Sequence, residues 1–435
     1  MPQSRLDTKL ALFNSTISTC EKAGQWQVAL RCISVLPTRS LSADTISMNA
    51  GISACQKGQQ WKRALQLFSM SQLVAMSDII SASAVTSAFG REAKWQPAIQ
   101  LLSNASAATL RPNVITYNAT ASACGRGAQW AVALDMLPVI YHAGVQPTAI
   151  SFNAIVSACE KGHGWSRALQ VCQDMQASGL TWTVITLSAL VSSCEKSQQW
   201  QKALEVFSRM SDASISPNST SFNAAISACA KAGQWVLAMQ LFWSMPSEAV
   251  TPDRVSFTAA IGACATSGQW QLVLALLSTM EVASIVHDVI SSNTSISALE
   301  KGEQWLMAMQ LLLSMAATKK EPNVASLSAA ISACETTCHW KHALQLLSDM
   351  PCTGIAPDIV SFNSATRAAV RQRNWEPALC VLRAMPLAKT KPDVVSYDIA
   401  TSAVDTAGSS CLVAVHLLSE ASAQRLWRLT RSMLS

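Results

Sequence analysis

Apolar residues recur with helical spacing inside short segments of the chain, and each segment ends at a polar break. Phe222, Ile226 and Cys229 follow an i, i+4, i+7 spacing, which predicts one face of an α-helix. After a polar break that contains a glycine, Trp235 opens a second apolar stripe. The segment closes at Pro252, because proline cannot continue a helix. The pattern therefore predicts a helical hairpin followed by a short loop.

This hairpin recurs along the chain, and tryptophan marks it. The series is Trp26, Trp61, Trp95, Trp130, Trp165, Trp200, Trp235, Trp270, Trp305, Trp340 and Trp375. Every step is 35 residues except the 34 between Trp61 and Trp95. Counted with tryptophan seventeenth, the eleven repeats cover residues 10–44, 45–78, 79–113, 114–148, 149–183, 184–218, 219–253, 254–288, 289–323, 324–358 and 359–393. A short segment (1–9) precedes them, and a degenerate capping repeat (394–428) and a tail (429–435) follow.

A single hairpin cannot bury its own apolar stripe, so neighbouring repeats are expected to stack into an all-α solenoid. The fixed place of tryptophan in each second helix favours packing within or between repeats. Trp182 and Trp243 lie outside the series and receive no role from the pattern. Cysteine follows the same period at eight places, inside helical patterns, which favours buried free thiols over disulfides.

Composition narrows the class of protein. Half of the residues are apolar and the mean hydropathy is +0.23, which excludes intrinsic disorder. No apolar run reaches the ~18 residues that a membrane helix needs, so we expect no membrane span. The N-terminal residues 1–9 have no apolar core and no visible targeting peptide. The net charge of +6 is modest, so basic character must come from where the charges lie.

The loops and the residues after them resemble the pentatricopeptide repeat. Pro112-Asn-Val-Ile-Thr-Tyr-Asn118 and Pro392-Asp-Val-Val-Ser-Tyr397 are two examples, and the resemblance runs from about Leu10 to about Trp427. The near-equal repeats resemble the pure 35-residue subclass, in a tryptophan-containing variant. The tetratricopeptide repeat is the main rival, but its tryptophan lies in the first helix of the unit. The resemblance implies a right-handed superhelix that binds single-stranded RNA, one base per repeat.

Two polar positions of each repeat carry the implied base reading. The fifth-position residues are Asn14, Asn49, Ser83, Asn118, Asn153, Ser188, Asn223, Thr258, Asn293, Ser328 and Asn363. The last-position residues are Asp44, Asp78, Asn113, Thr148, Thr183, Asn218, Asp253, Asp288, Asn323, Asp358 and Asp393. Plain helix N-caps would also favour Ser, Thr, Asn and Asp at these places, but capping alone does not require alternation between aspartate and asparagine. We call a fifth residue and the last residue of the same repeat a reading pair.

The side chains of the reading pairs can match the donors and acceptors on the Watson–Crick edges of the bases. Uracil and guanine present an imino N–H, which an aspartate can accept, whereas adenine and cytosine present an acceptor nitrogen beside an amino group, which an asparagine amide can match. By the code of the family, asparagine at the fifth position favours pyrimidines, and serine or threonine favours purines. The eleven pairs then imply the target 5′-UUAYYAUGCGU-3′, with the protein N-terminus at the RNA 5′ end.

Two further series have a structural and a functional interpretation. The aliphatic series occupies second positions and would sandwich bases or pack between helices: Ile46, Ile80, Ile115, Ile150, Ile185, Val255, Ile290 and Val360. The basic series occupies thirteenth positions and would contact phosphates or offset helix dipoles: Lys22, Lys57, Arg91, Arg126, Lys161, Lys196, Lys231, Lys301 and Arg371. The family resemblance favours the RNA contact in both series.

The sequence does not indicate an enzyme, a cofactor or a small-molecule substrate. It has no Cys-x-x-Cys of a zinc deaminase, no clustered carboxylates of a nuclease and no Gly-rich phosphate loop. Cys334, Cys338, His339 and His342 lie close in sequence, but we expect no metal there, since Cys334 occupies the buried cysteine position of its repeat.

The expected function is sequence-specific binding of single-stranded RNA, with other RNA-processing proteins as further expected partners. By resemblance, the target is an organellar transcript, in a mitochondrion or chloroplast, and the role lies in its processing, stability or translation. The alternative is a helical-repeat scaffold for protein–protein interaction with the same architecture.

Overall fold

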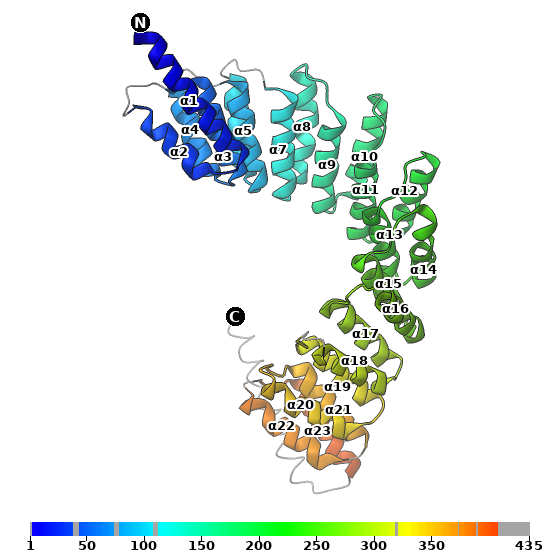
Figure 1. Cartoon of the computed structure of the whole chain (residues 1–435). Coiled ribbons are helices and arrows are strands. Elements are labelled where there is room, and N and C mark those ends of the chain that lie inside the picture. The colour runs from blue at the N-terminus through cyan, green and yellow to red at the C-terminus, as the bar shows by residue number, and fades with distance from the viewer. Residues whose placement is uncertain are drawn as a thin grey trace, which may run out of the picture. The chain divides into compact units, whose positions relative to one another are not determined.

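The structure is a computed structural model that describes residues 2–37, 43–73, 78–107, 112–317, 321–372, 374–388 and 390–407. Its described secondary structure is helical (Figure 1). The chain divides into two compact bodies, residues 1–228 and 229–435. The expected all-α solenoid of helical hairpins is confirmed. The end of the predicted degenerate repeat (408–428) and the tail 429–435 lie outside the described residues.

Odd-numbered helices are the first helices of the repeats, and even-numbered helices are the second. The first helices are α1 (Pro2–Lys22), α3 (Thr45–Lys57), α5 (Ile79–Arg91), α7 (Val114–Arg126), α9 (Ala149–Lys161), α11 (Val184–Lys196), α13 (Ser219–Lys231), α15 (Arg254–Thr266), α17 (Val289–Lys301), α19 (Val324–Thr336), α21 (Ile359–Arg371) and α23 (Val394–Ala407). From α3 onward each begins at the first residue of a counted repeat. α1 instead begins at Pro2, in the segment set apart as 1–9, because no residue there breaks a helix and proline is tolerated in a first turn.

Each second helix begins at the tryptophan of the series. These helices are α2 (Trp26–Val35), α4 (Trp61–Leu73), α6 (Trp95–Ala107), α8 (Trp130–His142), α10 (Trp165–Ala177), α12 (Trp200–Asp212), α14 (Trp235–Ser244), α16 (Trp270–Val282), α18 (Trp305–Ala317), α20 (Trp340–Cys352) and α22 (Trp375–Leu387). The 3₁₀ turn η2 (Pro246–Glu248) follows α14.

Packing is layered within each body. In the N-terminal body the first helices α1, α3, α5, α7, α9 and α11 contact one another in succession, and in the C-terminal body α15, α17, α19, α21 and α23 do the same. Within each body, second helices pack against the first helix of their own repeat and the first helix of the next, as α16 does against α15 and α17. The first helices therefore form one continuous layer in each body. The reading pairs lie along the edge of this layer where the first helices begin.

Tryptophan packs between repeats, as expected. A Cβ added to Gly162 would lie 2.1 Å from Cδ1 of Trp130, so the indole of one hairpin covers the helix end of the next. Trp305 stacks on His339 of the following repeat, with ring centroids 4.1 Å apart. Trp182, which the sequence left without a role, donates a hydrogen bond from Nε1 to the carbonyl of Cys172 at 3.0 Å.

The described cysteines are free thiols, and most of them are buried. Burial raises the pKa of the Cys159 thiol to about 11, so this side chain stays neutral and behaves as a small apolar group.

Candidate functional site

The last residue of each repeat caps the helix that follows. Oδ1 of Asp44 accepts a hydrogen bond from the backbone N–H of Ser47 at 2.8 Å. Apart from Thr148, the other last-position residues, Asp78, Asn113, Thr183, Asn218, Asp253, Asp288, Asn323, Asp358 and Asp393, do the same for their helices. Thr148 makes its capping contact through the hydroxyl of Ser151. Capping occupies one side-chain oxygen and leaves the other polar atom of an Asp or Asn for further bonds.

In at least five of the seven repeats whose fifth residue is asparagine, the asparagine side chain bonds the last residue of the same repeat. Nδ2 of Asn14 donates to Oδ2 of Asp44 at 2.8 Å, and Nδ2 of Asn49 donates to Oδ2 of Asp78 at 2.9 Å. The same contact joins Asn153 to Thr183 at 3.3 Å, Asn293 to Asn323 at 3.1 Å and Asn363 to Asp393 at 3.4 Å. Residues about 30 apart in sequence therefore meet between two adjacent first helices. Asn118 keeps a buried side-chain oxygen without a partner, which leaves an acceptor unused at its site.

Where the fifth residue is serine or threonine, its hydroxyl turns back to its own helix. Ser83 donates to the carbonyl of Ile80 at 2.8 Å, and Thr258 donates to that of Arg254 at 2.8 Å. Ser188 and Ser328 bond their own helices in the same way, at 3.1 and 3.2 Å. The shorter side chain is therefore bonded to its own helix and not to the last residue, which the asparagine amide bonds in other repeats.

The pKa values of four capping aspartates, Asp44, Asp78, Asp288 and Asp393, lie below their ordinary value. Burial raises the pKa of Asp44, but hydrogen bonds from the backbone and hydroxyl of Ser47 and from Asn14 outweigh it and hold the pKa below its ordinary value. The pKa values of Asp78, Asp288 and Asp393 are lowered by the same balance, with burial again opposed by hydrogen bonds from the capped turn. Near neutral pH these carboxylates are acceptors only.

The aliphatic series is exposed. Its members range from Val255, at 56% exposure, to Ile150, at 67%, and the others (Ile46, Ile80, Ile115, Ile185, Ile290 and Val360) lie between them. Large apolar side chains that recur regularly on a surface mark a binding site, because their exposure to water is unfavourable unless a partner covers them. They stand three residues before the fifth position on the same helix, so they flank the reading pairs. Packing between helices does not account for them.

The basic series is exposed throughout and also links repeats. Nζ of Lys57 lies 3.2 Å from Glu21, and Nζ of Lys196 lies 2.8 Å from Glu160, each on the preceding first helix. Lys301 and Arg91 donate to backbone carbonyls at the ends of the preceding first helices, at 3.1 and 3.3 Å. These surface bonds are weak and can exchange for a phosphate. The series lies eight residues beyond the fifth position, which is about 12 Å along the helix.

The twelfth position carries carboxylates that sequence reasoning did not assign. Oε1 of Glu21 accepts from Ser53 at 2.8 Å, and Oε1 of Glu195 accepts from Ser227 at 2.6 Å, each from the ninth position of the next repeat. Burial raises the pKa of Glu335 despite the nearby Arg367 and Arg371. The Cys-Glu-Lys segment that recurs at residues 20–22, 159–161 and 194–196 is the sequence signal for this link between repeats.

The cysteine and histidine residues considered for a metal do not form a site. Cys334 is buried in the core, and His339 and His342 both lie against the ring of Trp305. Among the described residues no group of three or more His, Cys, Asp or Glu side chains is placed to hold a metal ion. No helix in the described part of the chain is long and apolar enough to cross a membrane.

Comparisons with known proteins agree with the repeat pattern. A profile of the pentatricopeptide repeat domain matches residues 100–161, 170–232 and 345–404, and a profile of the PPR repeat family matches residues 217–266. No protein of curated function matches the sequence.

Among solved structures, the fold is similar to that of the pentatricopeptide repeat protein PPR10 from maize, with a TM-score of 0.56 and 19% identity. The match covers 95% of this chain and 64% of the maize protein, so the chain spans less than two thirds of that protein's length. A structure of PPR10 in complex with an 18-nt psaJ RNA element matches with a TM-score of 0.49 and 18% identity, over 95% of this chain and 59% of the other.

Proposed function

The chain belongs to the pentatricopeptide repeat family, and from this premise we propose that it binds single-stranded RNA sequence-specifically, with about one base per repeat. The proposed target is 5′-UUAYYAUGCGU-3′. The chain does so without catalysis of its own, and the bound RNA is an organellar transcript whose processing, stability or translation depends on the complex. Other RNA-processing proteins are the proposed partners on that transcript.

The observation that carries the proposal is the geometry of the reading pairs. The fifth and last residues of a repeat meet at one edge of the layer of first helices, as Asn14 and Asn49 do with Asp44 and Asp78. Exposed aliphatic side chains such as Ile46 and Ile80 stand beside them. A flat base fits between two such aliphatic groups, with its Watson–Crick edge toward the polar pair. Asparagine and serine at the fifth position differ in reach, which supports the distinction between pyrimidines and purines.

A protein-binding scaffold is the competing function, and the same observation weighs against it. Capping would be satisfied by any mixture of Asp, Asn, Ser and Thr, and it uses only one side-chain oxygen. The second oxygen of Asp44 and Asp78 is instead held by asparagine in a fixed orientation. A scaffold has no need of that orientation, whereas base recognition does.

We expect the full chain to bind an 11-base RNA of the proposed sequence more tightly than its complement, because each mismatched base costs roughly 1–3 kcal/mol where bases are read directly. Fluorescence anisotropy with labelled oligomers measures the two affinities at one salt concentration. A DNA oligomer of the same sequence tests whether the 2′-hydroxyl contributes. Equal binding of target and complement would refute base reading, and binding of neither would favour the scaffold.

We expect the affinity for the target to fall with salt. For a single strand the slope of log K against log salt is about −0.7 per phosphate contact, so the nine members of the basic series allow at most about −6. Replacing Lys22 and Lys161 with glutamine should make the slope shallower by about 0.7 for each lysine. Lys62→Gln, an equal change of charge on a second helix, should leave the slope unchanged. An equal effect of all three changes would assign the salt dependence to net charge alone.

A further inference from the structure

Arg254 stands out among the first positions of the repeats. From α3 to α23, the first turns of the first helices are otherwise built from uncharged residues, and the first position is valine in five repeats. A cation at a helix N-terminus is disfavoured by the helix dipole. Its side chain is nevertheless 59% exposed at the edge of the layer where the reading pairs lie. Local helix propensity therefore does not explain this arginine.

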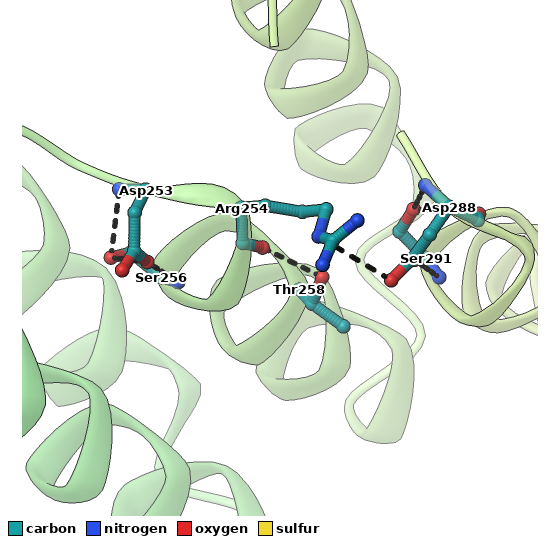
Figure 2. Close-up of polar contacts among 6 residues, drawn as sticks. All are labelled: Asp253, Arg254, Ser256, Thr258, Asp288 and Ser291. Carbon is teal, nitrogen blue, oxygen red and sulfur yellow. Dashed lines mark hydrogen bonds and ion pairs between the residues drawn. The ribbon is translucent and has the colours of Figure 1, made fainter. Parts of the chain in front are cut away.

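The guanidinium of Arg254 faces the acceptor of the eighth reading pair, Thr258 and Asp288. Its Nε lies 3.7 Å from Oδ2 of Asp288. Oδ1 of Asp288 is engaged by the backbone N–H of Ser291 at 2.8 Å, so Oδ2 is the oxygen left for a base. Figure 2 shows Arg254 and Asp288 directed toward each other, with Thr258 one helical turn after Arg254 on the same side of α15. The separation exceeds a hydrogen bond, so the donors of the guanidinium are not consumed by Asp288.

We propose that Arg254 is a third specificity-determining residue for the eighth nucleotide, donating to O6 of guanine while Asp288 accepts from the imino N–H beside it. The inference rests on the proposed function and refines it at one repeat. Guanine presents an acceptor next to a donor, and the Arg254–Asp288 couple presents a donor next to an acceptor. Adenine presents the reverse order, with an amino group facing the guanidinium and an unprotonated nitrogen facing the carboxylate. Both contacts then become unfavourable.

Thr258 distinguishes guanine from uracil at the eighth nucleotide, which Arg254 does not. Uracil has the same order of acceptor and donor as guanine, so Arg254 does not separate these two bases. The hydroxyl of Thr258 is turned to the carbonyl of Arg254, which leaves space for the larger purine. Arg254 therefore discriminates guanine from adenine, and Thr258 discriminates purines from pyrimidines.

The tenth repeat provides an internal control. Its reading pair, Ser328 and Asp358, also implies guanine, but its first residue is Val324. Oδ1 of Asp358 accepts from Ser361, as Oδ1 of Asp288 does from Ser291. Both repeats present an equivalent carboxylate, but only the eighth has a guanidinium beside it. Preference for G over A should therefore be stronger at the eighth base than at the tenth.

The test measures the affinity of the full chain for four 11-base RNAs, with G or A at the eighth base and G or A at the tenth. In Arg254→Val, we expect the G-over-A ratio at the eighth base to fall about tenfold, the effect of losing one charge-assisted hydrogen bond, while the ratio at the tenth base stays the same. The reciprocal Val324→Arg should raise the ratio at the tenth base. Thermal unfolding followed by circular dichroism verifies that both variants are folded.

The outcomes separate this inference from the function on which it rests. An unchanged ratio at the eighth base, with G still preferred at the tenth, overturns the role of Arg254 and leaves base reading intact. An equal loss of affinity for all four RNAs also overturns it and makes Arg254 a phosphate contact. No preference at either base in the unsubstituted chain overturns the proposed function, and this inference with it.

Discussion

Ser328→Asn should change the base preferred at the tenth position of the target from G to U. Serine at this site bonds its own helix at 3.2 Å and leaves space beside Asp358. Asparagine would place an amide against Asp358, as Asn14 does against Asp44 at 2.8 Å, and would exclude a purine from that space. Each good pair is worth roughly 1–3 kcal/mol of discrimination, so the ratio of G to U affinities should shift by about 100-fold. Binding titrations with RNAs that differ only at the tenth base measure this ratio.

The matched control is Ser328→Thr, which recreates the fifth residue of the eighth repeat. It should keep the preference for G, because threonine can also return its hydroxyl to its own helix, as Thr258 does. The eleventh base, which we propose is read by Asn363 and Asp393, should stay U in both variants. Retention of G in the Ser328→Asn variant would mean that the fifth position does not read bases.

Ser292→Ala should stabilise the C-terminal body, although it removes a polar group from a protein with few charges. Ser292 is fully buried on α17, and its hydroxyl has no hydrogen-bond partner. It stands at the fourth position of its repeat, where Phe222, Phe257 and Phe362 are buried in other repeats. An unsatisfied buried hydroxyl costs about 1–3 kcal/mol, so its removal should raise the free energy of unfolding by an amount in that range.

Ser295→Ala supplies the opposite case on the same helix. Ser295 is equally buried, but its hydroxyl donates to the carbonyl of Ser291 at 2.8 Å. The same substitution there should lower the free energy of unfolding by about 0.5–1.5 kcal/mol. Urea unfolding followed by circular dichroism compares the two variants directly. Destabilisation of similar size in both would show that Ser292 has a partner after all.

The sequence by itself determined what is local. The period of tryptophan placed the start of every second helix, and the polar last residue of each repeat marked the N-cap of the next first helix, because a helix is built from hydrogen bonds between residues close in the chain. The stacking of hairpins also followed, since one hairpin cannot bury its own stripe. Among the described helices, the start of α1 differed, because helix propensity alone does not show how far a helix extends before its first tertiary contact.

Only the tertiary structure decided how residues of neighbouring repeats meet. The distance and rotation between adjacent first helices bring Asn14 to Asp44, and Glu21 to Ser53. The same packing leaves Ile46 exposed and buries the hydroxyl of Ser292 without a partner. The meeting of Arg254 and Asp288 belongs here as well, because the two residues are 34 positions apart and no periodic pattern specifies the direction of a long side chain. Such contacts depend on the shapes of two packed helices, and a one-dimensional repeat does not contain that information.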